Sequence, residues 1–129
     1  MENAVVKRTM FVVAVPNLDT SAAFYRDVLG FTIEIIPDPG WRFYRLGSCC
    51  IFAGECPDAP HPSTIGDHSY FAYIVLEDID SYHQSVTAKG VTVIKPLRTE
   101  PWGMREFGVK TVDGHRIMFG ADSPEKPIP

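Results

Sequence analysis

The chain has 129 residues, of which 45% are hydrophobic and 22% are charged, and its formal net charge is −4. These values predict a single globular domain with a substantial core and exclude a disordered chain. Lys7-Arg8 is the only adjacent basic pair, whereas a nucleic-acid interface needs clustered Lys and Arg. No apolar run is long enough to span a bilayer. We therefore expect neither a nucleic-acid nor a membrane partner.

The three cysteines favour a reducing compartment. Cys49 and Cys50 are adjacent and would point to opposite faces of a strand, while Cys56 lies in a proline-rich segment. This spacing is a poor framework for disulfides. The first residues, Met-Glu-Asn-Ala, also lack the basic-then-apolar pattern of a signal peptide. The sequence therefore predicts a cytoplasmic protein.

The first half of the chain predicts a strand, a helix and three further strands. Residues 9–15 form an apolar run typical of a buried strand. Asp19 or Thr20 is suited to cap a helix that Gly30 closes. The three strands are expected at residues 31–36, 41–46 and 49–53. A connector rich in proline follows at residues 54–67.

The second half repeats this order. Residues 70–76 predict an apolar strand, and Asp78 is suited to cap a helix with Ile79, Tyr82, His83 and Val86 at helical spacing. Gly90 ends that helix. The remaining strands are expected at residues 91–97, 104–112 and 115–120, with an Asp113-Gly114 hairpin turn between the last two.

Short matches between the halves indicate a duplicated module. Asn17-Leu18-Asp19 matches Asp78-Ile79-Asp80, and Arg42-Phe43-Tyr44 matches Arg105-Glu106-Phe107. The offset of about 60 residues suits a supersecondary unit better than a solenoid repeat. We therefore predict an α+β fold of two tandem βαβββ modules, with curved mixed sheets around a cleft. Within the single domain of residues 1–129, the modules would span 9–54 and 69–121, joined by a linker at 55–68 and followed by a flexible tail at 122–129.

Two segments resemble the vicinal oxygen chelate superfamily, which includes glyoxalase I, extradiol dioxygenases, fosfomycin-resistance enzymes and bleomycin-binding proteins. The first runs from Val15 to Phe31 (VPNLDTSAAFYRDVLGF) and is similar to the opening of that fold. The second combines Pro101 to Phe107 (PWGMREF) with Asp113 to Phe119 (DGHRIMF) and is similar to the closing hairpin of bleomycin-resistance-like members. The resemblance implies the fold for most of the chain but not the reaction.

The resemblance also locates the metal positions of the family's enzymes. These fall at Met10, at Ile51 or Phe52, at Phe71 (or Tyr70), and at Met118. None of these side chains offers the imidazole or carboxylate that Zn, Ni, Mn or Fe prefers. Without the ion there is no Lewis acid. The sequence therefore places the chain nearest to the metal-free, bleomycin-resistance-like members and predicts no cofactor.

Aromatic residues and methionines are the candidates for ligand contacts. In bleomycin-resistance-like members, aromatic side chains around the cavity stack on flat ligand rings. The methionines of this chain, Met10, Met104 and Met118, would give an adaptable apolar lining. The predicted ligand-binding residues are Trp41, Phe43, Phe52, Phe71, Trp102, Met104, Arg105 and Met118. For any single aromatic residue, filling of the core is the alternative. Arg105 would hold an anionic ligand group if it points inward; otherwise it is solvated or pairs with Glu100 or Glu106.

The favoured interpretation is a homodimer that sequesters a small molecule, an antibiotic or a metabolite, in an apolar cleft without metal. The alternative is a metal-dependent lyase, isomerase or dioxygenase with a displaced site built from His61, His68 or Glu55. A metal-free enzyme using Arg105 and Tyr44, and a structural dimer with a vestigial cleft, also stay open. The sequence does not indicate whether the modules pair within one chain or between chains.

Overall fold

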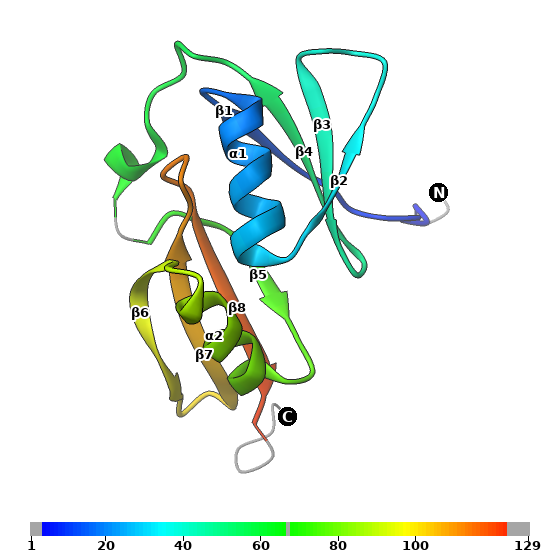
Figure 1. Ribbon diagram of the computed structural model, residues 1–129. Coiled ribbons are helices and arrows are strands. Elements are labelled where there is room, and N and C mark those ends of the chain that lie inside the picture. The colour runs from blue at the N-terminus through cyan, green and yellow to red at the C-terminus, as the bar shows by residue number, and fades with distance from the viewer. Residues whose placement is uncertain (1–3, 67, 124–129) are drawn as a thin grey trace.

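The computed structural model describes residues 4–66 and 68–123, and it contains two four-stranded sheets, each accompanied by a helix (Figure 1). The first module comprises β1 (Phe11–Val15), α1 (Leu18–Phe24), the π-helical turn η1 (Tyr25–Leu29), β2 (Thr32–Ile35), β3 (Trp41–Leu46) and β4 (Cys49–Glu55). Its strand order is β1-β4-β3-β2, with β1 parallel to β4 and the other pairs antiparallel. We call this sheet the N-sheet.

The second module repeats the same topology. A connector with the 3-10 turn η2 (Pro62–Ile65) leads to β5 (Tyr70–Val75), α2 (Ile79–Ala88), β6 (Thr92–Thr99), β7 (Met104–Lys110) and β8 (Arg116–Asp122). The order is β5-β8-β7-β6, with β5 parallel to β8. We call this sheet the C-sheet. The predicted α+β fold of tandem βαβββ modules is confirmed, and the two sheets do not close into a barrel.

Several boundaries differ from the prediction because hydrogen bonding, not side-chain pattern, decides where an element ends. Asn17 caps α1 in place of Asp19 or Thr20, since its side chain accepts the Thr20 N–H at 2.9 Å. Asp78 caps α2 as predicted, accepting the Ser81 N–H at 3.1 Å. Strand β8 continues to Asp122, two residues past its expected end and up to the first residue of the expected tail. The rest of that tail, residues 124–129, lies outside the described residues.

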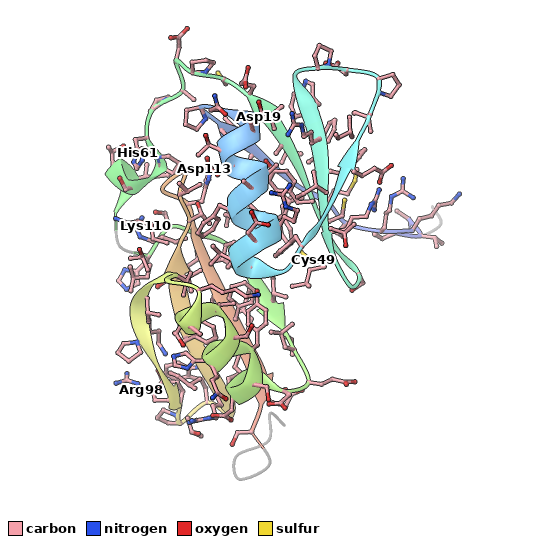
Figure 2. The ribbon with its side chains drawn as sticks, viewed as in Figure 1. Asp19, Cys49, His61, Arg98, Lys110 and Asp113 are labelled. Atoms are coloured by element: carbon pink, nitrogen blue, oxygen red, sulfur yellow. The ribbon has the colours of Figure 1, made fainter. Side chains whose placement is uncertain are left out.

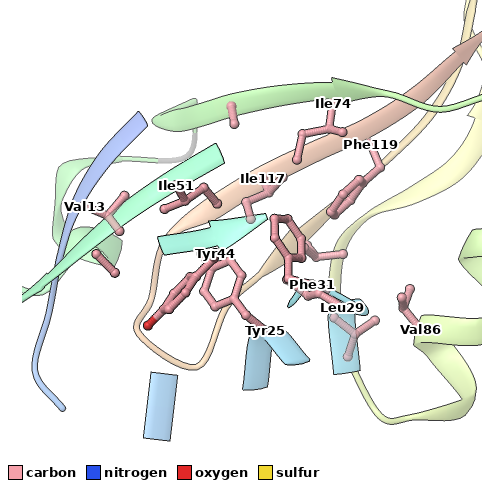
Figure 3. Close-up of a cluster of buried hydrophobic side chains, with 14 of the residues drawn as sticks. Val13, Tyr25, Leu29, Phe31, Tyr44, Ile51, Ile74, Val86, Ile117 and Phe119 are labelled. Atoms are coloured by element: carbon pink, nitrogen blue, oxygen red, sulfur yellow. The ribbon is translucent and has the colours of Figure 1, made fainter. Parts of the chain in front are cut away.

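The helix-covered faces of both sheets share one core. Helix α1 contacts β3 and β4, and α2 contacts all three antiparallel strands of the C-sheet. Figure 3 shows Ile51 of β4 and Ile117 of β8 in the same buried cluster as Tyr25 and Tyr44. The modules are also joined by a hydrogen bond from Tyr82 Oη to the carbonyl of Leu29 (2.7 Å). None of the described helices has the length and apolar character needed to cross a membrane.

Each sheet therefore has one face against the shared core and one face without a helix. We call the second the open face. Successive side chains of a strand alternate between the two faces. Because both helix-covered faces meet in the core, the open faces lie on the outer sides of the molecule, where a ligand or another chain can reach them.

Candidate functional site

Three aromatic rings form a stack across the open face of the N-sheet. The Trp41 and Phe52 ring centroids are 4.3 Å apart with planes 24° from parallel. The Phe43 and Phe52 centroids are 4.6 Å apart with planes at 21°. The three residues come from the paired strands β3 and β4, with Phe43 directly opposite Phe52. Offset stacking of this kind adds about 0.5–1.5 kcal/mol per pair beyond the area buried, so the three rings form one rigid apolar surface.

Gly54 makes room for the end of this stack. It lies opposite Trp41 in the sheet, and a Cβ at this position would be only 2.6 Å from the indole ring. The outer edge of the indole therefore occupies the space that a side chain at residue 54 would fill. Val12 of the edge strand β1 is opposite Phe52 and extends the apolar surface; its side chain is 65% exposed.

A charged pair borders the stack at its other end. The Arg45 guanidinium lies 5.0 Å from the centroid of the Phe43 ring, and its Nε donates to Glu34 Oε1 at 2.8 Å. Both partners are about half exposed, so water and salt weaken this ion pair. The pair positions a cation over an aromatic face, which is a favourable arrangement.

The open face of the C-sheet is organised around the carboxylate of Glu106, which is only 3% exposed. Its Oε1 accepts hydrogen bonds from Tyr73 Oη (2.8 Å) and from Trp102 Nε1 (3.1 Å). Its Oε2 lies 3.3 Å from Lys95 Nζ. Glu106 thus holds two aromatic side chains, one from β5 and one from the β6–β7 turn, through the same carboxylate oxygen. These donors and Lys95 supply the partners that a buried carboxylate requires.

Lys95 links Glu106 to a second buried carboxylate. Its Nζ lies 2.9 Å from Glu100 Oε2, and Arg98 Nε donates to the other Glu100 oxygen at 2.9 Å. Hydrogen bonding from Lys95 lowers the pKa of Glu100 below its ordinary value, although burial opposes this shift. Burial and the hydrogen bond to Glu106 raise the pKa of Tyr73. The phenol is therefore a neutral donor at physiological pH.

Two glycines provide space for tyrosine rings on this face. A Cβ on Gly120 would overlap the Tyr73 hydroxyl, and a Cβ on Gly108 would lie 2.7 Å from the Tyr70 hydroxyl. Met118 lies between Tyr73 and Gly108 in the strand register. The face therefore presents two tyrosine rings and the Met118 thioether around the hydrogen-bonded carboxylate of Glu106.

The amino-acid sequence matches the family model described as Glyoxalase/Bleomycin resistance protein/Dioxygenase superfamily over residues 7–119. The chain belongs to this superfamily. A search of curated proteins gave no match.

Solved structures of superfamily members and other proteins share the fold. A putative glyoxalase family protein from Bacillus anthracis is 22% identical, with a TM-score of 0.77 over 95% of this chain and 100% of its own. TnmS3, an antibiotic binding protein from Streptomyces sp. CB03234, is 20% identical, with a TM-score of 0.76 over 95% and 100% of the two chains. The fosfomycin resistance protein FosX from Listeria monocytogenes is 18% identical, with a TM-score of 0.72 over 95% and 98%. At these identities the likeness establishes the fold alone.

The positions that the superfamily resemblance assigns to metal ligands do not converge on donor atoms. Phe52 and Met118 lie on the two open faces, whereas Ile51 is fully buried in the core. Within residues 4–66 and 68–123, no group of three or more His, Cys, Asp or Glu side chains is arranged to hold a metal ion. Of the alternative donors, Glu55 accepts the Leu18 N–H at 3.0 Å, and the His61 ring lies against Gly114.

The structure brings some of the predicted ligand-binding residues together and separates others. Trp41, Phe43 and Phe52 share the N-sheet face, while Trp102 and Met118 belong to the C-sheet face. Met104 is buried at the start of β7. Phe71 instead packs between the modules, with its ring centroid 5.9 Å from Phe11 and 5.5 Å from His115. A β-bulge between Tyr70 and Ala72 interrupts the alternation that would have placed it.

Arg105 is directed to α2 and not to an open face. Its Nη2 lies 2.9 Å from Asp80 Oδ1, in the first turn of α2. Arg42 makes the equivalent contact in the first module, with Nη2 2.7 Å from Asp19 Oδ1. These two pairs are the residues that the internal repeat aligns. Both arginines therefore connect a strand of their sheet to the helix of the same module. The ion pair of Arg105 with Glu100 or Glu106, which the sequence left open, is not among the ion pairs of the described residues.

The residues that organise the C-sheet face, Glu106, Tyr73 and Lys95, were not predicted from the sequence. One signal was available, because Glu106 precedes the apolar Phe107 in a strand and must therefore point away from the core. Its partners come from three separate elements. Such nonlocal contacts leave no pattern in a single sequence.

Proposed function

We propose that this protein binds and sequesters a flat, mainly apolar small molecule, an antibiotic or a metabolite, without a metal ion. The observation that carries the proposal is the aromatic stack of Trp41, Phe52 and Phe43 on a sheet face without a helix. A preformed row of rings loses little conformational entropy when it receives another ring. Stacking then supplies affinity, and the few polar groups at the margin supply orientation.

The site is completed by a second copy of the chain. In a two-fold dimer, the N-sheet of one protomer would face the C-sheet of its partner, and the symmetry would create two equal clefts. Two features support this arrangement. The open faces lie on outer sides of the chain, and the edge strands β1 and β5 carry exposed Val12 and Val75. Exposed apolar edges of this kind favour pairing with another chain.

The relatives and the cysteines fit this proposal. TnmS3, whose fold this chain shares, is described as an antibiotic binding protein. Cys49, Cys50 and Cys56 are free thiols, which agrees with a reducing cytoplasm. In a cytoplasmic binding protein the ligand is held by shape and stacking, so no chemical step is required.

The proposal is tested by titrating the protein with doxorubicin, a flat polycyclic probe, and following tryptophan fluorescence. Phe52→Ala removes the middle ring and keeps both tryptophans as reporters. We expect affinity to fall by about tenfold, the equivalent of one or two lost stacking contacts. Light scattering on the same samples should give the mass of a dimer, and the titration should saturate at two probe molecules per dimer.

Ile65→Ala is the matched control, because Ile65 is an exposed apolar residue of the connector, away from the stack. It should bind the probe like the wild type. Equal affinity of Phe52→Ala and wild type would remove the aromatic stack from the site. A monomer that binds the probe with full affinity would show that a second copy is not needed.

A further inference from the structure

A small cavity lies at the carboxyl end of β1, where Ala14 and Cys56 separate it from the Trp41 end of the aromatic stack. It has a volume of about 250 Å³ and is enclosed by the end of β1, the connector and the turn between β7 and β8. Its walls are mainly proline and alanine, contributed by Ala14, Pro16, Pro57, Ala59, Pro60 and Pro62. The polar lining groups are Cys56, His61 and Asp113. This volume is below the usual range for drug-sized ligands, so it suits a compact molecule.

Asp113 is the unusual member of this lining. It lies in a hairpin turn, where side chains are normally solvated, yet it is only 3% exposed. Its Oδ2 accepts a hydrogen bond from Ser21 Oγ at 2.7 Å, and that hydroxyl in turn accepts from Tyr44 Oη at 2.9 Å. Among the hydrogen bonds of the described residues, none reaches the second carboxylate oxygen. One oxygen therefore joins the hairpin to α1, and the other is available to the cavity.

Among the described residues, no Lys or Arg forms an ion pair with this carboxylate. Desolvation raises the pKa of Asp113, while Ser21 and His61 act in the opposite direction. A buried carboxylate without a cationic partner is costly. A positively charged ligand would offset this cost.

His61 closes the cavity on the connector side. Its ring lies against Gly114, where any side chain at residue 114 would overlap it, and it accepts or donates a hydrogen bond with Ser63. Figure 2 shows His61 and Asp113 on these neighbouring segments, beside the start of α1. The described lining residues include neither Lys nor Arg, and His61 is the one that can carry a positive charge.

We propose that this cavity is a second binding site, specific for a compact organic cation such as a short branched alkylammonium. The ammonium group binds the free oxygen of Asp113, and the proline and alanine walls hold the alkyl group. A charge-assisted hydrogen bond to a desolvated carboxylate is stronger than a neutral one. Because Asp113 itself is buried, the charge of the ligand strongly affects its affinity.

The test is a titration of the protein with isobutylammonium chloride at pH 7.5, followed by ¹H–¹⁵N NMR, with isobutanol as the neutral probe of similar shape. Shifts should concentrate on the amides of Ala14, Cys56 and Gly114. Asp113→Asn keeps an acceptor for Ser21 but loses the charge. We expect it to bind isobutylammonium about tenfold more weakly or worse. Isobutanol should bind wild type more weakly by a similar factor.

Glu77→Gln is the control for net charge, because Glu77 is exposed and lies outside this cavity. It should bind like the wild type. If Asp113→Asn does not fold, Ala59→Leu narrows the cavity at a wall residue that does not border the Trp41 surface, and it should strongly reduce the shifts. Equal binding of the two probes, wild-type affinity in Asp113→Asn or Ala59→Leu, or shifts confined to the Trp41 surface would overturn the proposal.

Discussion

The two modules have equivalent cores but different open faces. The strand register makes Tyr44 and Ile51 of the N-sheet equivalent to Phe107 and Phe119 of the C-sheet, and all four are fully buried. The next residues on the outer side are Phe43 and Phe52 in the N-sheet, a stacked pair. Their equivalents in the C-sheet are Glu106 and Gly120, which are also directly paired.

This difference separates what the fold requires from what the site requires. Packing fixes the core positions, so both modules keep large apolar residues there. The outer positions are free of that constraint, and they carry aromatic rings in one sheet and hydrogen-bonded polar groups in the other. On the N-sheet the rings stack on one another and leave an apolar surface that no helix covers. On the C-sheet Gly120 leaves space for Tyr73 to reach Glu106, so the polar groups satisfy one another.

The largest effect is expected from Glu106→Ala on the C-sheet. The change leaves Tyr73 Oη and Trp102 Nε1 without their acceptor and removes one of the two carboxylates around Lys95. Unsatisfied polar groups and a broken buried pair predict a loss of about 2–4 kcal/mol in the free energy of unfolding. Urea denaturation measures this quantity.

Two variants sharpen the result. Glu106→Gln keeps an acceptor oxygen for both donors and should lose less stability than Glu106→Ala. Phe43→Ala, at the equivalent position of the N-sheet, should lose about 1 kcal/mol, because that ring is only partly buried. Equal losses for Glu106→Ala and Phe43→Ala would contradict the distinction between the two faces.

A smaller effect is expected from Gly54→Ala on the N-sheet. The new Cβ would lie 2.6 Å from the Trp41 ring, so the indole must leave its place on the sheet. Overpacking of this kind costs about 1–3 kcal/mol. A shift of tryptophan emission to longer wavelength and weaker doxorubicin quenching should accompany the loss. Gly40→Ala, where the Cβ would lie 3.5 Å from its nearest neighbour, should change neither signal.

Local patterns predicted the modules well, and nonlocal contacts explain what they missed. Alternation placed Phe43 and Phe52 on one face, and the repeat aligned Arg42 with Arg105, which make the same contact to a helix. The bulge beside Phe71 breaks alternation without a marker such as glycine. The environment of Asp113 also depends on Ser21, which is 92 positions away in the chain. A hairpin Asp-Gly pair predicts the turn but not this burial.

The smallest effect concerns acid pH and again distinguishes the two faces. The pKa of Glu100 is lowered in the folded protein, mainly by Lys95. The corresponding stabilisation is complete above the ordinary glutamate pKa of about 4.3, and it is lost as the pH falls through the lower folded value. The rings of the N-sheet stack do not titrate.

Thermal unfolding between pH 5 and pH 3 should therefore show a shallower decline of Tm in Lys95→Met than in wild type, because the variant has less of this stabilisation to lose. Phe43→Ala should decline in parallel with wild type. If the Lys95→Met and wild-type curves are parallel, the Lys95–Glu100 pair does not contribute to the acid sensitivity of the C-sheet.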